Sequence, residues 1–421
     1  MTQRFRTAKG GRIDRSAPVE FRYDGRRYQG YRGDTLASAL LANGVRLLGR
    51  SFKLHRPRGV FTAGAEEPNA LAELRLGARR EPNTRMTGIE LHEGLVAASQ
   101  NRFPSLRFDL MSLAGLAAPV LSAGFYYKTF MWPASFWEKV YEPRIRAAAG
   151  LGRAAREPDP DGYEALHAHC DVLVVGGGAA GLAAAHAAGA AGQRVMLCEQ
   201  DFQLGGGLLA EPAQDAWREA MLAALQAMPE VVLLPRTTVF GYYDGNVLGA
   251  VERVADHLAV PPPHTPRQRR WTIHAGRVVL ATGAHERLIA FPGNDRPGVM
   301  LAGAVRSYLN RFGVRPGQRA VLFANNDEAY QAIFAAQDAG MAIAGVVDPR
   351  ADSAGLAQAR ARRLAVWANS EVCGTLGGTS LRGVRLRHRG GVGTDTRLTC
   401  DLLCVSGGYN PAVQLASQSG T

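Results

Sequence analysis

The chain has 421 residues, 46% of them apolar and 20% charged, a composition typical of a globular protein with two or three domains. Its five cysteines are scattered, which predicts no disulfide framework and indicates a reducing, cytoplasmic compartment. The net charge is +12, and residues 1–60 carry fourteen Lys or Arg against four Asp or Glu. No aromatic-interleaved basic motif or helix-turn-helix pattern accompanies this charge, so we expect a solvated or partner-facing module and no nucleic-acid partner.

The sequence indicates no secretory signal, no membrane span and no metal site. The first sixteen residues lack the apolar core of a secretory signal. The apolar run 110–125 contains a proline and is shorter than the ~20 residues of a membrane span, so we expect no membrane association. Cys400 and Cys404 are the only close cysteine pair; we expect them on one face of a buried strand and predict no metal site.

Residues 1–97 have the pattern of a ferredoxin-like β-grasp module. Two alternating runs flank Asp24-Gly25 within 17–32, which predicts a hairpin. An amphipathic helix is expected over LASALLANG, after the capping residue Thr35. A plant-type ferredoxin would carry C-x4-C-x2-C in the next loop, but 59–71 has no cysteine and cannot hold that cluster. Glu66 and Glu67 in this loop could act in acid–base chemistry, although a solvated or arginine-paired loop is favoured.

Residues 98–165 form an aromatic-rich connecting segment. NRFPSLRFDL (101–110) and GFYYKTFMWPASFWEKVYEP (124–143) concentrate Phe, Tyr and Trp. A ligand cage is one interpretation, and packing between domains or against a partner subunit is the favoured one. REPDPDGYE (156–164) has the composition of a linker.

Residues 166–295 predict a first dinucleotide-binding domain. VLVV (172–175) is a short buried strand, Gly176-Gly177-Gly178-Ala179-Ala180-Gly181 supplies G-x-G-x-x-G, and a helix and a second strand ending at Glu199 follow. The glycines allow a sharp turn, approach of a pyrophosphate and close helix–strand packing, and the helix N-terminus stabilises the phosphate charge. An acid at Glu199 favours an unphosphorylated ribose, in FAD or NAD, without separating the two.

Two later stretches extend this flavoprotein-like pattern. LGGG (204–207) supplies a glycine pair expected to pack under the diphosphate. VVLATGAHER (278–287) predicts a strand followed by a tight exit turn whose backbone passes near the nucleotide. His285 after this turn and His186 on the first helix are the polar candidates, and both are interpreted as structural or partner-facing.

Residues 296–421 predict a second, degenerate dinucleotide-binding domain. Strand and helix follow in the right order, but the turn at 324–329 reads Ala-Asn-Asn-Asp-Glu-Ala and keeps no motif glycine. Asp327 and Glu328 would face a phosphate with negative charge, so a docking domain without cofactor is favoured. Asp348 is the acid at the end of the next strand. We expect DLLCVSGGYNPAVQL (401–415) to end this unit and the return to the first domain to lie beyond residue 421.

Taken together, these stretches resemble one family over essentially the whole chain. GRSFKLHRPRGVFTAGAEEPNAL (49–71), NRFPSLRFDL, AGFYYKTFMWPASFWEKVYEP, the 176–207 region, ATGAHER and SGGYNP are similar to the alpha subunit of heterotetrameric sarcosine oxidase. The resemblance implies oxidative demethylation of sarcosine to glycine, with O2 reduced to H2O2 and the one-carbon unit passed to tetrahydrofolate or released as formaldehyde. It also implies NAD on this chain, FAD and the small secondary amine on the beta subunit, FMN at the alpha/beta interface, and gamma and delta subunits as further partners.

The resemblance also assigns site residues. It implies no catalytic residue and no metal ligand on this chain. Its C-terminal aminomethyltransferase-like folate domain has no counterpart in these 421 residues. The expected nucleotide contacts are Gly176, Gly177, Gly178, Ala179, Ala180, Gly181, Glu199, Gln200, Asp201, Gly205, Gly206, Gly207, Val239, Thr282 and Gly283.

Two departures from the family pattern and two alternatives remain. The family often has Asp at position 199 and Thr at position 207, where this chain has Glu and Gly. One alternative is the corresponding subunit of a related amine, opine or cyanide-forming dehydrogenase, which the missing cluster cysteines disfavour. The other is a non-catalytic scaffold that holds NAD and docks other subunits, and it is compatible with the first interpretation.

Overall fold

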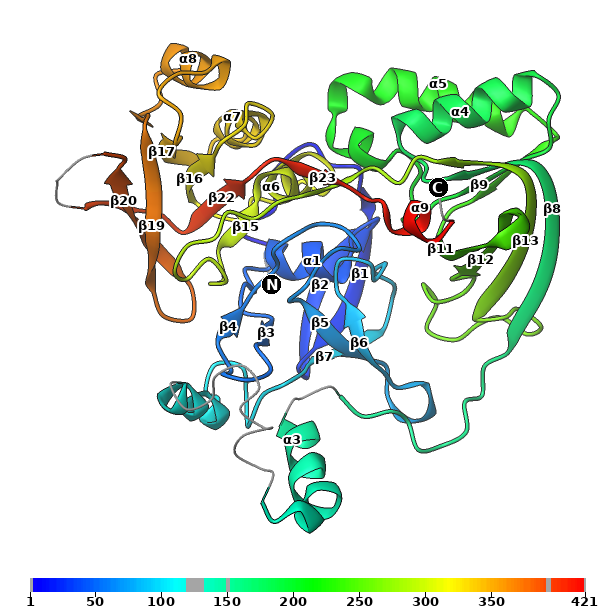
Figure 1. Cartoon of the computed structure of the whole chain (residues 1–421), viewed down its shortest axis with the longest axis horizontal. Coiled ribbons are helices and arrows are strands. Elements are labelled where there is room, and N and C mark those ends of the chain that lie inside the picture. The colour runs from blue at the N-terminus through cyan, green and yellow to red at the C-terminus, as the bar shows by residue number, and fades with distance from the viewer. Residues whose placement is uncertain (1–2, 119–131, 149–151, 391–394, 420–421) are drawn as a thin grey trace.

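The computed structural model describes residues 3–118, 132–148, 152–390 and 395–419. Figure 1 shows an N-terminal module at the centre, with one α/β unit at its right and a second at its left. Each unit is built on its own sheet, and the expected α/β class is confirmed. No helix among these residues is both long and apolar enough to cross a membrane.

The N-terminal module is a five-stranded sheet of order β2-β1-β7-β5-β6. Its strands are β1 (Asp14–Tyr23), β2 (Arg26–Arg32), β5 (Leu71–Leu74), β6 (Glu81–Arg85) and β7 (Leu95–Ser99). The hairpin prediction is confirmed, because β1 and β2 pair antiparallel across Asp24 and Gly25, both at positive φ. A small ribbon of β3 (Gly49–Arg50) and β4 (Pro57–Arg58) precedes the loop that lacks cysteine.

Helix α1 (Leu36–Ala42) begins at the expected N-cap, where the Thr35 hydroxyl accepts a hydrogen bond from the Ser38 N–H. The prediction of an amphipathic helix was wrong, since all seven of its residues are buried. Its outer face is covered by the N-terminal segment, in which the Phe5 N–H bonds the Ala42 carbonyl. Arg6 also forms an ion pair with Asp34, just before the helix.

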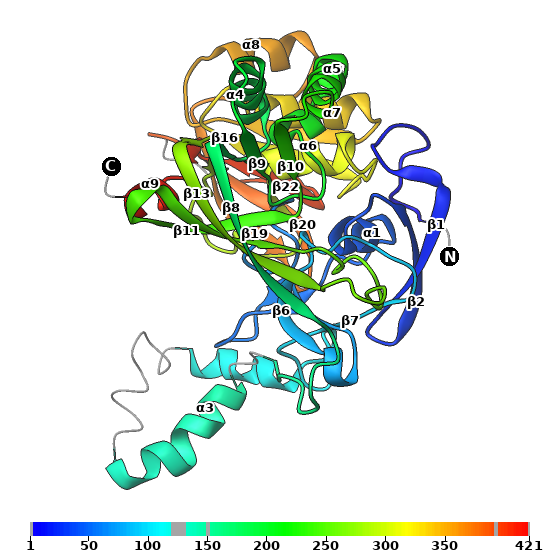
Figure 2. The same ribbon diagram turned by 90° about the vertical axis from the view of Figure 1, so that its right-hand side faces the viewer.

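The connecting segment extends away from the rest of the molecule. It contains 3-10 turns at Leu110–Ala117 and Ala134–Phe136, a π turn at Trp137–Tyr141, and α3 (Glu142–Ala148). Figure 2 shows α3 standing out from the sheets. Its described aromatic and aliphatic side chains are largely exposed, so they do not pack between the domains of this chain. Residues 124–131 of the stretch 124–143 lie outside the described residues.

The first dinucleotide unit is a six-stranded sheet of order β10-β9-β8-β13-β12-β11, with α4 (Ala179–Ala190) and α5 (Asp215–Gln226) packed together above it (Figure 1). Strands β10, β9, β8 and β13 are parallel, as the motif requires, and β12 and β11 continue antiparallel. The strand expected at 172–175 is much longer than predicted, because β8 pairs with β13 from Tyr163 onward. The strands are β8 (Tyr163–Val175), β9 (Val195–Cys198), β10 (Val231–Leu234), β11 (Thr237–Tyr243), β12 (Val247–Glu252) and β13 (Gln268–Leu280).

The second unit is a parallel sheet of order β15-β22-β16-β17-β18, extended by an antiparallel sheet β19-β20-β21. Its strands are β15 (Val299–Leu301), β16 (Arg319–Ala324), β17 (Ala342–Val347), β18 (Val366–Trp367), β19 (Ser370–Gly377), β20 (Leu381–His388), β21 (Thr396–Thr399) and β22 (Leu402–Ser406). Its helices are α6 (Ala302–Asn310), α7 (Tyr330–Asp338) and α8 (Ala354–Ala361). Cys404 lies within β22 and Cys400 precedes that strand; both are buried and free.

The chain returns to the first unit before residue 421, contrary to expectation. Strand β23 (Tyr409–Pro411) pairs with β14 (Ala284–Glu286), and α9 (Gln414–Gln418) then packs on β11. The Leu415 side chain enters the core of the first sheet, and the Tyr242 N–H bonds the Gln418 side chain. The return was missed because this short segment has no hydrophobic repeat of its own and is held by the tertiary pairing of β14 with β23.

One hydrophobic core runs from the N-terminal module into the second unit without a break. It joins α1 and the five-stranded sheet to α6, α7 and the parallel sheet. The first dinucleotide unit has two smaller cores, one on each face of its sheet. The N-terminal module is therefore packed on the second unit, and a ligand site can form where both meet the first.

Candidate functional site

The G-x-G-x-x-G turn connects β8 to α4, and two of its glycines are required by contact with neighbouring backbone. Gly176 has a φ of +105°, and a Cβ there would lie 2.3 Å from the Ala281 carbonyl oxygen. A Cβ on Gly181 would lie 1.8 Å from the Gly176 carbonyl oxygen. The turn therefore folds only with glycine at both positions, as the motif predicts.

The opposite face of the turn is open. A Cβ on Gly178 would meet nothing within 4 Å, although this residue starts a twelve-residue helix. Among the described residues no side chain caps the N-terminus of α4, so its first backbone N–H groups lack a capping acceptor. The arrangement suits an anion such as a pyrophosphate.

Glu199 lies at the end of β9, where the motif requires an acid, and it is 7% exposed. Its carboxylate accepts hydrogen bonds from the Gly177 N–H at 2.6 Å and from the Asp201 N–H at 2.8 Å. Burial raises the pKa of Glu199 above its ordinary value, while these backbone donors oppose the rise. The acid thus ties the glycine turn to the end of β9 and borders the cleft beside it.

The glycine pair after β9 packs against the turn. The Gly205 N–H donates to the Gly177 carbonyl at 2.8 Å, and a Cβ on Gly206 would lie 3.0 Å from the Gly178 Cα. Gly206 has a φ of +52°, and Gly207 faces open space. The glycine pair therefore packs on the first turn, and Gly207 lines the cleft.

A cleft of about 920 Å³ runs along this surface and is walled by all three parts of the fold. The first unit contributes Ala179, the stretch 199–202 and Gly206–Gly207; the N-terminal module contributes 62–66 and 81–88; and the second unit contributes residues of α6. Of the predicted contacts, Gln200 is exposed at the cleft, and Asp201 is held by a bidentate ion pair with Arg311 at 2.7 Å. Asp201 therefore already has a cationic partner in the second unit.

Nine of the fifteen predicted contacts do not line this cleft: Gly176, Gly177, Gly178, Ala180, Gly181, Gly205, Val239, Thr282 and Gly283. Val239 packs into the core beneath β11, and its neighbour Thr238 lines the cleft instead. The Thr282 hydroxyl donates to the Ala412 carbonyl at 2.7 Å, and the Gly283 carbonyl accepts the Ala412 N–H. The exit turn thus binds the returning segment, which sequence patterns had not placed there.

The second turn, at 324–329, is filled by its own side chains. Arg350 pairs with Asp327 and with the fully buried Asp348, both at 2.7 Å. The Tyr330 hydroxyl donates to Asp348 at 2.7 Å, and the Asn326 side chain bonds Ser406. The acid that would contact a ribose in a complete motif is therefore occupied by residues of the same chain.

The loop that would carry cluster cysteines is organised by Glu67. This fully buried carboxylate accepts hydrogen bonds from the N–H groups of Phe61, Thr62, Asn69 and Ala70, and from the Thr62 hydroxyl. Glu66, its neighbour, is exposed at the cleft. Glu67 is thus a structural acceptor for backbone donors, where one sequence interpretation expected an arginine partner.

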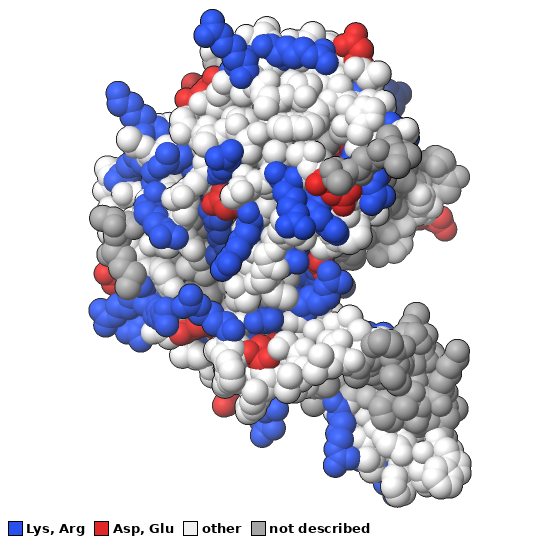
Figure 3. Space-filling model, turned by 90° about the vertical axis from the view of Figure 1, so that its left-hand side faces the viewer, with Lys and Arg blue, Asp and Glu red and all other residues white. Residues whose placement is uncertain are grey.

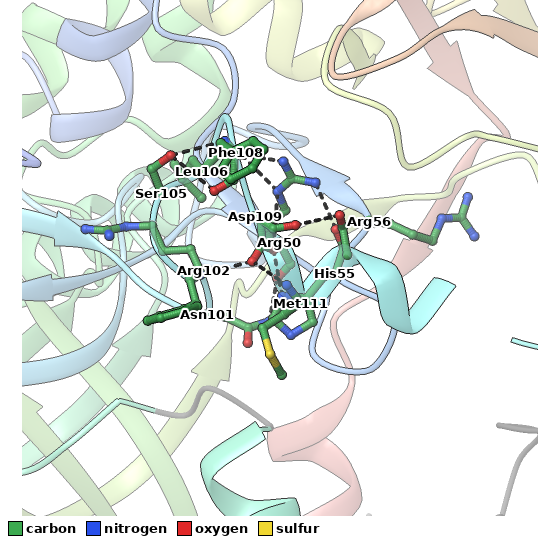
Figure 4. Close-up of polar contacts among 12 residues, drawn as sticks. Arg50, His55, Arg56, Asn101, Arg102, Ser105, Leu106, Phe108, Asp109 and Met111 are labelled. Atoms are coloured by element: carbon green, nitrogen blue, oxygen red, sulfur yellow. Dashed lines mark hydrogen bonds and ion pairs between the residues drawn. The ribbon is translucent and has the colours of Figure 1, made fainter. Parts of the chain in front are cut away.

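A buried polar cluster fixes the start of the connecting segment (Figure 4). Asp109 accepts hydrogen bonds from the Phe103 and Met111 N–H groups, and His55 Nδ1 lies 2.8 Å from its carboxylate. Arg50 lies 3.8 Å from the same carboxylate and bonds the Leu106 carbonyl. The cluster anchors the segment to the β3–β4 ribbon while its apolar side chains stay outside.

Glu286 is the residue that sequence reasoning missed. It follows His285 in the ATGAHER stretch and lies in β14, where it borders the cleft next to the start of α6. His285 does not line the cleft, and His186 is half-buried on α4. An acid three residues after the exit turn was the available signal, but only the pairing of β14 with β23 places it at the cleft.

Two family models match parts of the chain. Residues 16–102 match a 2Fe-2S iron-sulfur cluster binding domain, and residues 170–311 match a pyridine nucleotide-disulphide oxidoreductase. The first cysteine of the chain is Cys170, so the matched module has no thiolate ligand and does not fit a cluster. Its fold is kept with Glu67 bonding the loop amides.

The sarcosine oxidase alpha subunit of Rhizobium meliloti (strain 1021) is 52% identical over 425 residues, covering 99% of this chain and 42% of that protein. The chain is similar to this sarcosine oxidase alpha subunit over almost its whole length. It spans about two fifths of the length of this relative. An opine oxidase subunit of Agrobacterium tumefaciens (strain Ach5) is 31% identical over 189 residues, covering 42% of this chain and 36% of that protein. The sarcosine oxidase match is thus both longer and closer.

The fold also matches a solved enzyme structure. L-proline dehydrogenase from P. horikoshii superposes with a TM-score of 0.63 at 18% identity, covering 99% of this chain and 65% of that chain. A match at this identity shows the fold alone. It supports the arrangement of an N-terminal module beside two α/β units in this chain.

Proposed function

We propose that this chain is the NAD-binding alpha subunit of a sarcosine oxidase. The observation that carries the proposal is the open face of the glycine turn, where uncapped amides of α4 lie beside Gly178. Glu199 lines the cleft beside the position proposed for the adenosine ribose, and its negative charge would repel a 2′-phosphate. Bound NAD would supply a pyridine ring, and the 176–181 turn, Glu199 and Gly205–Gly207 would hold its adenosine diphosphate half.

The proposed reaction belongs to the assembled enzyme. Sarcosine is oxidatively demethylated to glycine, O2 is reduced to H2O2, and the one-carbon unit goes to tetrahydrofolate or leaves as formaldehyde. FAD and the amine sit on the beta subunit, FMN lies at the alpha/beta interface, and gamma and delta complete a cytoplasmic complex. Similarity to sarcosine oxidase alpha subunits supports these assignments, and we place the substrate chemistry outside this chain.

The connecting segment is the proposed docking surface for those subunits. Its described residues expose a run of large apolar side chains that Asp109 holds in place: Phe103, Phe108, Leu110, Met111, Leu113 and Leu116. Contiguous exposed apolar side chains of this kind mark protein–protein interfaces. Anchoring by a buried cluster keeps the surface ordered before a partner binds.

Nucleotide binding can be tested by replacing Gly178 with alanine. Gly178→Ala adds a methyl group that fits the empty turn, with φ at −76°, but stands where a pyrophosphate would approach. We expect the complex to fold and to lose at least ten-fold in NAD occupancy, measured by chromatography of the nucleotide released on denaturation. Gly162→Ala is the matched control, because its Cβ also meets nothing within 4 Å and it lies before Tyr163, at the opposite end of β8 from the turn.

Further measurements on the same complex separate the alternatives. Glu199→Ala should also lower occupancy, and unchanged occupancy would remove Glu199 from the ribose role. Recovery of FAD from this chain in place of NAD would overturn the nucleotide assignment. Stoichiometric iron would favour a cluster-containing dehydrogenase instead.

A further inference from the structure

Glu286 places a second carboxylate in the cleft that Glu199 lines. One of its oxygens, Oε2, accepts the Gly303 N–H at 2.8 Å, at the start of the nine-residue helix α6. The other, Oε1, is buried without a well-formed hydrogen bond among the described residues, although the Ser406 hydroxyl lies near the carboxyl. α6 has no side-chain cap from its own N-cap residue, so Glu286 caps its N-terminus from another element and leaves its second oxygen without a strong partner beside the cleft.

The charges around Glu286 make this part of the cleft acidic. Glu66 of the N-terminal loop and Glu328 of the second unit both raise its pKa, and Arg306 on α6 is paired with Glu328 and Glu211. Further titratable groups near it are Tyr409 on the paired strand β23 and the buried Cys404 on β22. Three carboxylates, of Glu286, Glu66 and Glu328, outnumber the single arginine, Arg306. This part of the cleft therefore favours a positively charged ligand group.

The cleft connects this acidic part to the glycine turn. Of the glycine turn Ala179 lines the cleft, and Glu199, Gln200, Ala284, Glu286 and Gly303 line the same cleft. A dinucleotide whose pyrophosphate lies at the turn, and whose adenosine ribose lies at Glu199, directs its second half towards Glu286.

We infer that Glu286 is a specificity-determining residue that makes the cleft bind the oxidised pyridine nucleotide in preference to the reduced one. The inference rests on the proposed NAD site. NAD⁺ carries a pyridinium cation and NADH a neutral dihydropyridine ring, while their adenosine diphosphate halves are identical. An ionised carboxylate with one oxygen that lacks a strong partner stabilises the cationic ring and gives the neutral ring no such interaction.

The preference for NAD⁺ over NADH should increase as the pH rises. Burial, with the charges of Glu328 and Glu66, raises the pKa of Glu286 to about 7, against the Ser406 hydroxyl and the Gly303 N–H, which lower it. The carboxylate is therefore largely neutral at pH 6 and largely ionised at pH 8. The ratio of NAD⁺ to NADH affinity should rise about ten-fold across this interval, as about one charge appears at the site.

The test measures dissociation constants of NAD⁺, NADH and ADP-ribose by isothermal titration calorimetry on the assembled enzyme freed of bound nucleotide. Glu286→Gln keeps an oxygen for the Gly303 N–H but removes the charge, so we expect it to abolish both the preference and its pH dependence while ADP-ribose affinity stays unchanged. Glu81→Gln is the matched control, since Glu81 also lines the cleft but is paired with Arg75. It should behave as wild type.

The outcomes distinguish the two proposals. If none of the three ligands binds wild type, the NAD site itself is wrong. If ADP-ribose and NAD⁺ bind and Glu286→Gln leaves the NAD⁺ to NADH ratio and its pH profile unchanged, only the role of Glu286 is overturned. If Glu286→Gln weakens ADP-ribose as much as NAD⁺, the residue acts on cleft structure and the specificity role also fails.

Discussion

Two adjacent glutamates in the 59–71 loop have opposite surroundings. Glu67 is fully buried and receives hydrogen bonds from both sides of the loop, whereas Glu66 is exposed. In a cluster-binding ferredoxin loop, backbone amides face the metal centre; here a carboxylate takes their hydrogen bonds. The loop conformation therefore depends on one side chain.

Glu67→Gln should lower the free energy of unfolding by about 3 kcal/mol, because the amide group presents a donor to backbone N–H groups that need an acceptor. Urea denaturation followed by circular dichroism measures the loss. Glu66→Gln is the control and should change stability by less than about 0.5 kcal/mol. Equal effects of the two changes would show that Glu67 does not organise the loop.

Glu286 makes stability depend on pH independently of any ligand. Because its folded pKa is about 7, above the ordinary value of 4.5, the folded protein binds this proton more tightly than the unfolded chain does. The stabilisation is full below about pH 4.5 and is lost as the pH rises to about 7. Relative to Glu286→Gln, wild type should lose about 3 kcal/mol between pH 4.5 and 8, measured by paired urea titrations. Other titrating groups cancel in the difference, and a difference that stays constant with pH would contradict the assignment.

At the scale of elements, the two strand–turn–helix units differ in what fills the turn. The first leaves the N-terminus of α4 open, while the second places Arg350 between Asp327 and Asp348. In the second turn Arg350 is the charged partner of the fully buried Asp348, in the place that a nucleotide would otherwise take. The second turn is thus stabilised without a nucleotide.

Arg350→Ala should therefore destabilise the protein by about 3 kcal/mol, since it leaves Asp348 buried without its cation, and it should leave NAD occupancy unchanged. Thermal and urea unfolding, with nucleotide analysis of the same samples, measure the two effects. Arg362→Ala removes an exposed pair with Asp338 and should cost less than about 1 kcal/mol. A loss of nucleotide in Arg350→Ala would contradict the view that this turn is independent of the cofactor.

Local patterns were sufficient for some elements and insufficient for others. The β1–β2 hairpin, the N-cap at Thr35 and the first glycine turn were predictable because each depends on neighbouring residues. The complete burial of α1, the length of β8 and the return through β23 were not, because partners distant in the sequence determine them. Glu286 belongs to this second group, since nothing in the ATGAHER stretch indicates that β23 would hold it beside α6.

At the scale of the whole molecule, the early excess of arginine is partly internal. Arg6, Arg12, Arg46, Arg56 and Arg58 pair with Asp34, Asp215, Asp401 and Asp295, three of which lie in the dinucleotide units. These ion pairs join the N-terminal module to the two dinucleotide units. From composition alone, we had expected these arginines to face solvent or a partner. Figure 3 shows that Lys and Arg also gather over the face that carries α8 and β20.

The connecting segment carries exposed apolar side chains, which we propose are covered by another subunit. Leu113 and Leu116 are 63% and 83% exposed, on a segment that Asp109 anchors to the module. Leu113→Asp with Leu116→Asp should leave the circular dichroism and melting temperature of the chain within error, because neither side chain is buried, but should weaken assembly at least ten-fold through charges desolvated at the interface. Co-purification with the other subunits and light scattering measure the loss.

Leu76→Asp is the matched control for that experiment. Leu76 is 67% exposed on the N-terminal module, outside the connecting segment, so its replacement should leave assembly intact. If the double variant assembles as well as Leu76→Asp, the segment is not the docking surface. If it assembles normally but loses NAD, the segment acts on the cleft instead, and the anchoring cluster at Asp109 would have to transmit a change to a site walled by other elements. None of the polar partners of Asp109 among the described residues lines the cleft, so we expect NAD to be retained.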